Sequence, residues 1–141
     1  PYFNDEATYG GRKIYLWKRA QILVGDIYGI IKGVGVGYFD DLDYLTAFPD
    51  YKLPQILNHW KVMEYSPKLA EKIKLRTELK PGSNEEVEIR SATVWAVEYI
   101  NEELKARGVR LKSFEIDWLL WNESKRIEMS EQHHLTTTIF Y

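Results

Sequence analysis

Apolar side chains recur at helical spacing through most of this chain. Between Arg12 and Gly33 they form a wide stripe, made by Ile14, Leu16, Trp17, Ala20, Leu23, Val24, Ile27, Tyr28 and Ile31. Residues spaced three or four apart lie on the same side of a helix, and a stripe this wide is typical of a buried one. We therefore expect a mostly buried helix over residues 12–33, with Lys18, Arg19 and Asp26 as its polar exceptions.

The clearest helix prediction covers residues 83–108. Ser83 followed by Glu86 is typical of a capping box, which satisfies the first free N–H groups of a helix. Apolar positions recur through the segment, and Gly108 marks its end. Another helix is expected to begin at Ser113.

Prolines mark the starts of two shorter helices. Pro54 is suited to the first position of a helix, where no N–H group is needed. Pro67 repeats this arrangement, with Ser66 before it as the N-cap. Residues 40–48 resemble a short helix with acidic residues in its first turn. The glycines at 33, 35 and 37 lack the spacing of a phosphate-binding loop and indicate a flexible turn.

The remaining segments show no convincing alternation of apolar and polar residues. We expect an irregular lead-in over residues 1–11 and an extended tail near residue 141. The fold class predicted is therefore all-α, a compact orthogonal helical array in a single domain over residues 1–141. No heptad pattern lasts long enough for a coiled coil.

Charge and composition narrow the functional classes. The chain has 141 residues, no cysteine and a formal net charge of −2, so disulfides and thiolate chemistry are excluded. A protein that binds extended nucleic acid usually carries a basic excess, which is absent here. No apolar run is long enough to span a membrane, and no signal peptide opens the chain. These features favour a cytoplasmic protein.

The first residue is Pro1, so we expect that the start was processed or that an N-terminal part is absent.

Asp50 is the most suggestive acidic residue, because Pro49 and Pro54 stiffen the chain on both sides of it. Proline fixes its own φ and restricts the residue before it, Phe48, to extended geometry. Two interpretations are open. Asp50 is a capping residue of a turn, as Pro-Asp pairs often are, or it is a fixed anion directed into a cleft.

Lys18 and Arg19 interrupt an apolar helix face. Basic side chains in such places usually pack their stems and extend their charged ends into water. The alternative is a basic group turned inward to hold a ligand phosphate. Asp26 is expected to pair with one of these two cations.

Four further residues are predicted to be structural, and a fifth, Asp117, is left undecided. Glu88 and Arg90 are expected to form ion pairs with other helices, and Trp118 and Trp121 are expected in the core. Asp117 is either a buried hydrogen-bonding group or a solvated one. The three histidines, His59, His133 and His134, have no carboxylate partners at spacings typical of a metal site.

Four stretches together resemble a known family. WKRAQILVGDIYG (17–29), LTAFPDYKLPQILNHWKVMEYS (45–66), GSNEEVEIRSATVWAVEYI (82–100) and DWLLWNES (117–124) are similar, in this order, to the queuosine salvage family. The resemblance implies hydrolysis of the N-glycosidic bond of queuosine 5′-monophosphate, which releases queuine for reuse in tRNA modification. It also implies a helical fold similar to helical DNA glycosylases, a small nucleotide as the only ligand, and no metal or other cofactor.

The resemblance also assigns roles to four residues. The Asp of the family's Phe-x-Asp-Tyr motif falls on Asp50, as nucleophile or stabiliser of the oxocarbenium ion. The Lys of its Lys-Arg-Ala-Gln motif falls on Lys18, as a phosphate ligand. Tyr51 and Lys52 match positions that line the substrate pocket. The family often has Arg where Lys52 stands. This chain therefore has a compact ammonium group in place of a planar guanidinium, which can donate two parallel hydrogen bonds.

Family members are longer than this chain, and their additional part would precede residue 1. The resemblance therefore implies that this chain is the C-terminal half of a longer N-glycosylase, whose N-terminal half completes the pocket. Two other functions are compatible with the residues. One is excision of a damaged base from DNA, which would require a basic face and a wedge side chain. The other is a helical domain that binds nucleotides without catalysis.

Overall fold

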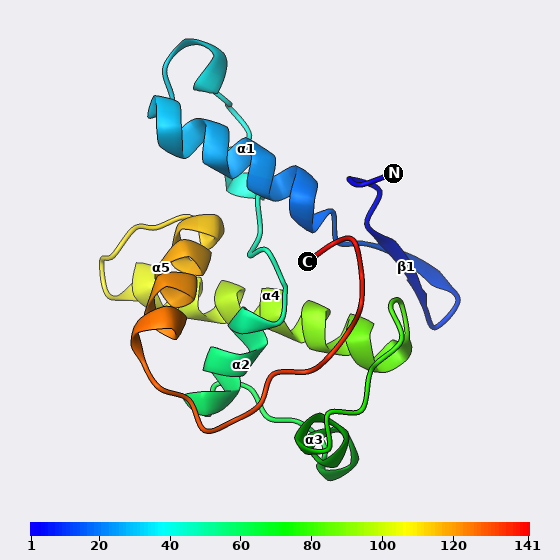
Figure 1. The fold of residues 1–141 in the computed structure, drawn as a ribbon. Helices are drawn as coiled ribbons and strands as arrows, with labels where there is room; N and C mark the ends of the chain where they lie inside the picture. Colours follow the sequence, from blue (N-terminus) through cyan, green and yellow to red (C-terminus); the bar gives the residue numbers. More distant parts are fainter.

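The computed structural model describes all residues, 1–141. It contains a two-stranded antiparallel hairpin, five α-helices and two short 3-10 helices (Figure 1). The elements in chain order are β1 (Glu6–Tyr9), β2 (Arg12–Tyr15), α1 (Lys18–Ile31), η1 (Gly35–Gly37), η2 (Leu42–Tyr44), α2 (Lys52–His59), α3 (Pro67–Lys74), α4 (Asn84–Ala106) and α5 (Ser113–Arg126). The fold is therefore mostly helical, as predicted.

The hairpin corrects the expectation of an all-α fold with an irregular start. β1 and β2 pair in the register Glu6↔Tyr15 to Tyr9↔Arg12. The turn between them is made by Gly10 and Gly11, whose φ angles of 54° and 77° suit glycine. Residues 12–15, which we expected to begin the first helix, are strand instead, because their backbone groups pair across this turn. α1 accordingly starts only at Lys18.

The main core lies between α2, α4 and α5, which pack against one another (Figure 1). Its members are buried aliphatic side chains, among them Leu53, Ile56, Leu57, Ile89, Val97, Ile116 and Leu120. α4 is the longest helix and passes behind α2 and α5 in the view of Figure 1. Trp118 is half-buried and Trp121 is exposed, so the expectation that both belong to the core is wrong for Trp121.

A smaller cluster attaches α1 to this body. It contains Leu42, Phe48 and Phe114, and half-buried rings and aliphatic groups pack around it. α1 meets the cluster through Gly25 and Gly29, where an added Cβ would lie 3.1 Å from Phe48 and 2.9 Å from Trp118. Glycine is needed at these positions because the aromatic rings approach the helix backbone closely.

The predicted helix starts are largely confirmed. Ser66 caps α3 by accepting a hydrogen bond from Leu69 N, and Pro67 is its first residue. Ser83 caps α4, whereas the carboxylate of Glu86 accepts from Gly82 N rather than from Ser83. The expectation that Pro54 is the first residue of its helix is wrong, because α2 begins two residues earlier, at Lys52.

Two predicted segments are shorter or more ordered than expected. The glycine-rich turn contains the 3-10 helix η1, and residues 40–48 form only the 3-10 helix η2.

The tail after α5 is extended, and Leu135 forms an isolated parallel bridge with Glu78. The chain ends beside the start of α1 (Figure 1). No helix combines the length and the apolar character that crossing a membrane requires.

Candidate active site

Asp50 is buried at the start of α2, with only 8% of its surface exposed. One carboxylate oxygen, Oδ1, accepts hydrogen bonds from the backbone N–H groups of Lys52 at 2.7 Å and of Leu53 at 3.3 Å. These N–H groups belong to the first turn of α2, where no carbonyl of the helix is available to accept them. The capping interpretation of Asp50 is therefore correct for Oδ1, which leaves the second oxygen, Oδ2, for another partner.

That partner is Lys18, the first residue of α1. Its Nζ lies 3.6 Å from Oδ2 of Asp50, and each of the two side chains is 11% exposed. Lys18 is therefore turned inward, and the usual arrangement, with the charged group in water, is wrong for this residue. Arg19 is exposed and donates to the carbonyl of Ile139 at 2.9 Å. Asp26 forms no ion pair within 4.0 Å, contrary to expectation.

The start of α1 is fixed by Asp5 in the segment before the hairpin. The carbonyl of Asp5 accepts from Leu16 N and Trp17 N, and its carboxylate accepts from Lys18 N at 3.2 Å. Trp17 has left-handed backbone geometry, with φ 45° and ψ 35°, and turns the chain from the hairpin into α1. A residue distant from Asp50 in sequence thus fixes the backbone from which the side chain of Lys18 extends.

The loop that precedes Asp50 has no regular structure, yet three helices hold its backbone. Gln21 of α1 accepts from Thr46 N at 2.8 Å. Asp117 of α5 accepts from Phe48 N at 2.6 Å, and Arg90 of α4 donates to the carbonyl of Pro49 at 3.2 Å. Ala47, Phe48 and Pro49 are themselves buried. Side chains thus supply the hydrogen bonds that a strand or helix would supply to buried backbone.

Arg90 is in turn held by acidic groups. Its guanidinium donates to both carboxylate oxygens of Asp5, at 2.9 and 2.5 Å, and lies 3.4 Å from Glu86. Asp5, Glu86 and Arg90 are all buried, a setting in which a bidentate Arg–carboxylate pair is strong and well oriented. The predicted pairing of Arg90 with other helices is wrong, because one partner lies before β1 and the other lies within α4. Glu88 accepts from Tyr9 instead.

Asp117 is the titratable group that sequence reasoning left undecided. It is 4% exposed. Its pKa is raised to about 7: burial is the largest cause, the hydrogen bond from Phe48 N–H opposes the rise, the negative charge of Asp50 adds to it, and Lys18 opposes it. The sequence does indicate that Asp117 is buried. Phe114 and Leu120 lie three residues before and after it, so these apolar side chains are on the same face of the helix. An acid on an apolar helix face is expected to be buried and hydrogen-bonded.

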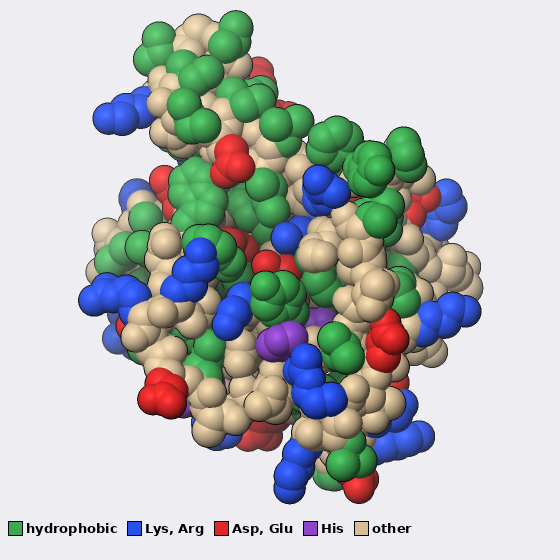
Figure 2. All heavy atoms as spheres, viewed as in Figure 1, with side chains coloured by type: hydrophobic (Ala, Val, Ile, Leu, Met, Phe, Trp, Pro, Cys, Tyr) green, Lys and Arg blue, Asp and Glu red, His purple; other side chains and the backbone are tan.

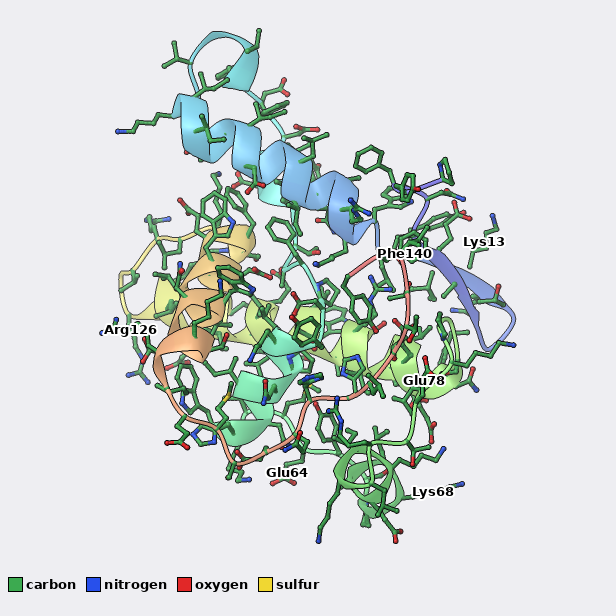
Figure 3. The ribbon with its side chains drawn as sticks, in the orientation of Figure 1. Lys13, Glu64, Lys68, Glu78, Arg126 and Phe140 are labelled. Carbon is green, nitrogen blue, oxygen red and sulfur yellow. The ribbon has the colours of Figure 1, made fainter.

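A cavity of about 520 Å³ adjoins Lys18. Residues from three parts of the chain line it: Phe3 near the N-terminus, Lys18, Arg19, Ile22, Leu23 and Asp26 from α1, and Ile139, Phe140 and Tyr141 from the tail. Figure 3 shows Phe140 on the tail between the start of α1 and the hairpin. The cavity thus combines two cationic side chains with aromatic rings, which suits a phosphorylated ligand that carries a planar base.

The tail is attached to the body by its last residue. Tyr141 donates a hydrogen bond to Glu86 at 2.9 Å, and its hydroxyl lies 3.1 Å from Nε2 of His134. The guanidinium of Arg90 lies 5.2 Å from the centre of the Tyr141 ring. Burial and nearby cations lower the pKa of His134 to about 4, so this imidazole is neutral at neutral pH.

Tyr51 and Lys52 lie on the other side of Asp50 and do not line the cavity beside Lys18. The ring of Tyr51 is exposed and stacks at a tilt on His133, with centroids 4.7 Å apart. The ammonium of Lys52 lies 3.3 Å from the side-chain oxygen of Gln55. No group of three or more His, Asp or Glu side chains is arranged to hold a metal ion. The structure thus brings Lys18, but not these two residues, to the free oxygen of Asp50.

Comparison with known proteins gives a consistent result along the whole chain. The family model described as queuosine salvage protein matches residues 1–141. A protein of Sphaerobacter thermophilus named queuosine 5′-phosphate N-glycosylase/hydrolase is 49% identical over 100% of this chain. Proteins with the same name from Dictyostelium discoideum and Mus musculus are 46% and 37% identical, over 99% and 100% of this chain.

The match covers only part of each relative. It spans 44% of the Sphaerobacter and Dictyostelium proteins and 45% of the mouse protein, and it lies in their C-terminal part. The chain therefore spans less than half the length of these relatives. Because the family model matches every residue and the identities run over the full chain, this chain belongs to the queuosine salvage protein family.

Proposed function

We propose that this chain contributes the reactive carboxylate and part of the nucleotide site of an enzyme that hydrolyses the N-glycosidic bond of queuosine 5′-monophosphate. The reaction releases queuine for reuse in tRNA modification. The names of the relatives support this substrate and reaction. The observation that carries the proposal is the fixed, buried carboxylate of Asp50, with its free oxygen 3.6 Å from the ammonium of Lys18.

Asp50 has the properties that this reaction requires. As the bond between ribose C1′ and the base nitrogen breaks, its electron pair leaves with the base and positive charge develops on the sugar ring. A carboxylate already in place stabilises that charge, or its oxygen forms a bond to C1′. In either case, water then supplies the hydroxyl group that bonds to C1′, and its proton is taken up by the base nitrogen. The products are queuine and ribose 5-phosphate, and the carboxylate is restored. Oδ2 of Asp50 is the oxygen for this role, because Oδ1 is occupied by two backbone N–H groups.

Lys18 is proposed to bind the 5′-phosphate. It forms an ion pair with Asp50 and also lines the cavity of about 520 Å³. Phosphate bound in this cavity would attract the ammonium away from Asp50 and leave the carboxylate free to face the sugar. Binding energy from a remote phosphate also helps to position the reacting centre. Arg19, on the same cavity wall, is exposed and can add a second positive charge.

Tyr51 and Lys52 are proposed to contact the base once the remaining part of the protein is present. They follow Asp50 directly, and the ring of Tyr51 contacts the tail at His133 rather than the cavity. An exposed aromatic ring next to a reactive carboxylate is a suitable platform for a planar base. The side chain of Lys52 would have to leave Gln55 to reach a ligand.

We infer three further properties of the whole protein. Its helices would pack in an orthogonal array similar to that of helical DNA glycosylases. Its N-terminal part would complete the pocket beside Asp50, since more than half of each relative lies outside the match. It would act in the cytoplasm on a small nucleotide, without a metal or other cofactor.

The test uses an extended protein, in which the unmatched N-terminal part of the Sphaerobacter relative is joined ahead of residue 1. The extended protein is incubated with queuosine 5′-monophosphate, and free queuine is measured by mass spectrometry. We expect stoichiometric release of queuine and ribose 5-phosphate. Binding of the nucleotide without release would favour a non-catalytic nucleotide-binding domain. Release of bases from damaged DNA in preference to the nucleotide would favour a DNA glycosylase.

A further inference from the structure

α1 is far less buried than its sequence requires. The helix is apolar on nearly all sides, which is typical of a helix surrounded by protein, yet within it only Lys18 and Gly25 are buried. Its exposed aliphatic side chains continue into the turn that follows. This outer stripe consists of Leu23, Ile30, Ile31, Val34 and Val36, which are 48%, 80%, 37%, 69% and 84% exposed.

The outer stripe lies opposite the face through which α1 meets the rest of the molecule. Gly25 and Gly29 form the inner face and pack against Trp118. Leu23 and Ile30 are seven residues apart, two turns of helix, and so lie on the same side. Figure 1 shows the far end of α1 standing away from the other helices, and Figure 2 shows apolar side chains gathered over this end. Single exposed apolar residues are ordinary, but a continuous aliphatic stripe indicates a binding surface.

We propose that the outer stripe is the docking surface for the N-terminal part of the longer protein, the part of the relatives that the match does not cover. The relatives supply an occupant of sufficient size, since the match covers only 44% of the Sphaerobacter protein. The stripe also adjoins the cavity beside Lys18, because Leu23 belongs to both. A segment seated on the stripe would therefore extend to the open side of that cavity.

The proposal concerns folding and association, and it holds whether or not the proposed reaction is correct. It is tested by comparing the 141-residue chain with the extended protein, using Ile30→Asp as the probe. Ile30 is 80% exposed in this structure, so the substitution should hardly change the melting temperature of the 141-residue chain. In the extended protein the new carboxylate would be buried in an apolar contact, which is costly. We expect a loss of several degrees in melting temperature there.

Leu119→Asp is the matched control. Leu119 is 59% exposed on α5, away from the outer stripe, and its substitution should have a small effect in both proteins. Hydrogen exchange provides a second measurement. Amides of residues 18–31 should exchange at least about tenfold more slowly in the extended protein than in the 141-residue chain.

Two results would overturn the proposal. In the first, Ile30→Asp lowers the melting temperature equally in both proteins and α1 gains no protection from exchange. In the second, the 141-residue chain alone forms a dimer that protects α1 and that Ile30→Asp dissociates, which would make a second copy the occupant. Light scattering distinguishes this second case.

Discussion

The ammonium of Lys18 faces the one carboxylate oxygen of Asp50 that the backbone leaves free, at 3.6 Å. Lys18 is the first residue of α1, Asp50 lies two residues before α2, and the pair is almost completely buried. A buried ion pair of this kind is sensitive to the loss of either partner, because the remaining charge is left uncompensated. The pair therefore allows the catalytic and the structural roles of each residue to be tested separately.

Asp50→Asn in the extended protein should abolish most of the glycosidase activity. At about 4 Å and an effective dielectric near 20, one negative charge stabilises a sugar cation by about 4 kcal/mol, or roughly a thousandfold in rate. The measurement is kcat by queuine release, with circular dichroism to verify the fold. Asp40→Asn, at an exposed position after η1, is the control. Wild-type rates in the Asp50 variant would refute the catalytic assignment.

Lys18→Ala should raise KM for queuosine 5′-monophosphate much more than for the dephosphorylated nucleoside. The reason is that Lys18 is proposed to hold the phosphate, which the nucleoside lacks. Steady-state kinetics with both substrates give the comparison, and Lys32→Ala, an exposed lysine after α1, serves as the control. If wild-type protein used nucleotide and nucleoside equally well, Lys18 would have no role as a phosphate ligand.

Stability should depend on pH through Asp117. Its pKa rises from the ordinary 3.8 to about 7 in the folded protein, mainly through burial. The folded state therefore holds this proton more tightly than the unfolded chain. The bound proton adds up to roughly 4 kcal/mol to the free energy of unfolding. This contribution is fully present below pH 3.8 and is lost as the pH rises towards 7.

Asp117→Asn should remove this dependence, because the amide oxygen can still accept from Phe48 N and has no proton to lose. Urea unfolding of the wild type and the variant at intervals between pH 4 and pH 8 checks the prediction. The free energy of unfolding of the wild type should fall relative to that of the variant as pH rises through this range. Parallel curves would show that Asp117 is ionised in the folded protein throughout.

Arg90→Lys should destabilise the protein by about 2–3 kcal/mol, although it conserves the charge. A lysine cannot make both bonds to Asp5 and also donate to the Pro49 carbonyl, as the guanidinium does. The measurement is the urea midpoint, compared with Arg107→Lys. Arg107 pairs with Glu103 at the surface, where such a change is within about 0.5 kcal/mol. Equal midpoints for the two variants would contradict the structural role of Arg90.

The sequence by itself determined most of the helices, because their signals are local, although residues 40–48 form only η2 and α1 begins at Lys18. Ser66 with Pro67 and Ser83 with its apolar run identify α3 and α4 from a few adjacent residues. The prolines around Asp50 also identified a stiffened carboxylate. The hairpin was missed because its strands are only four residues each, and pairing across a turn leaves little pattern in so short a segment.

Only the tertiary structure decided what surrounds that carboxylate. The direction of Lys18, the hydrogen bond of Asp117 to Phe48 N and the pairing of Arg90 with Asp5 each depend on contacts between distant segments. Whether a charged side chain turns into water or into the protein depends on which opposite charge the fold brings near it, since an unpaired buried charge is too costly. Helical periodicity predicts the face on which such a residue lies, but it contains no information about the partner that the fold brings to that face.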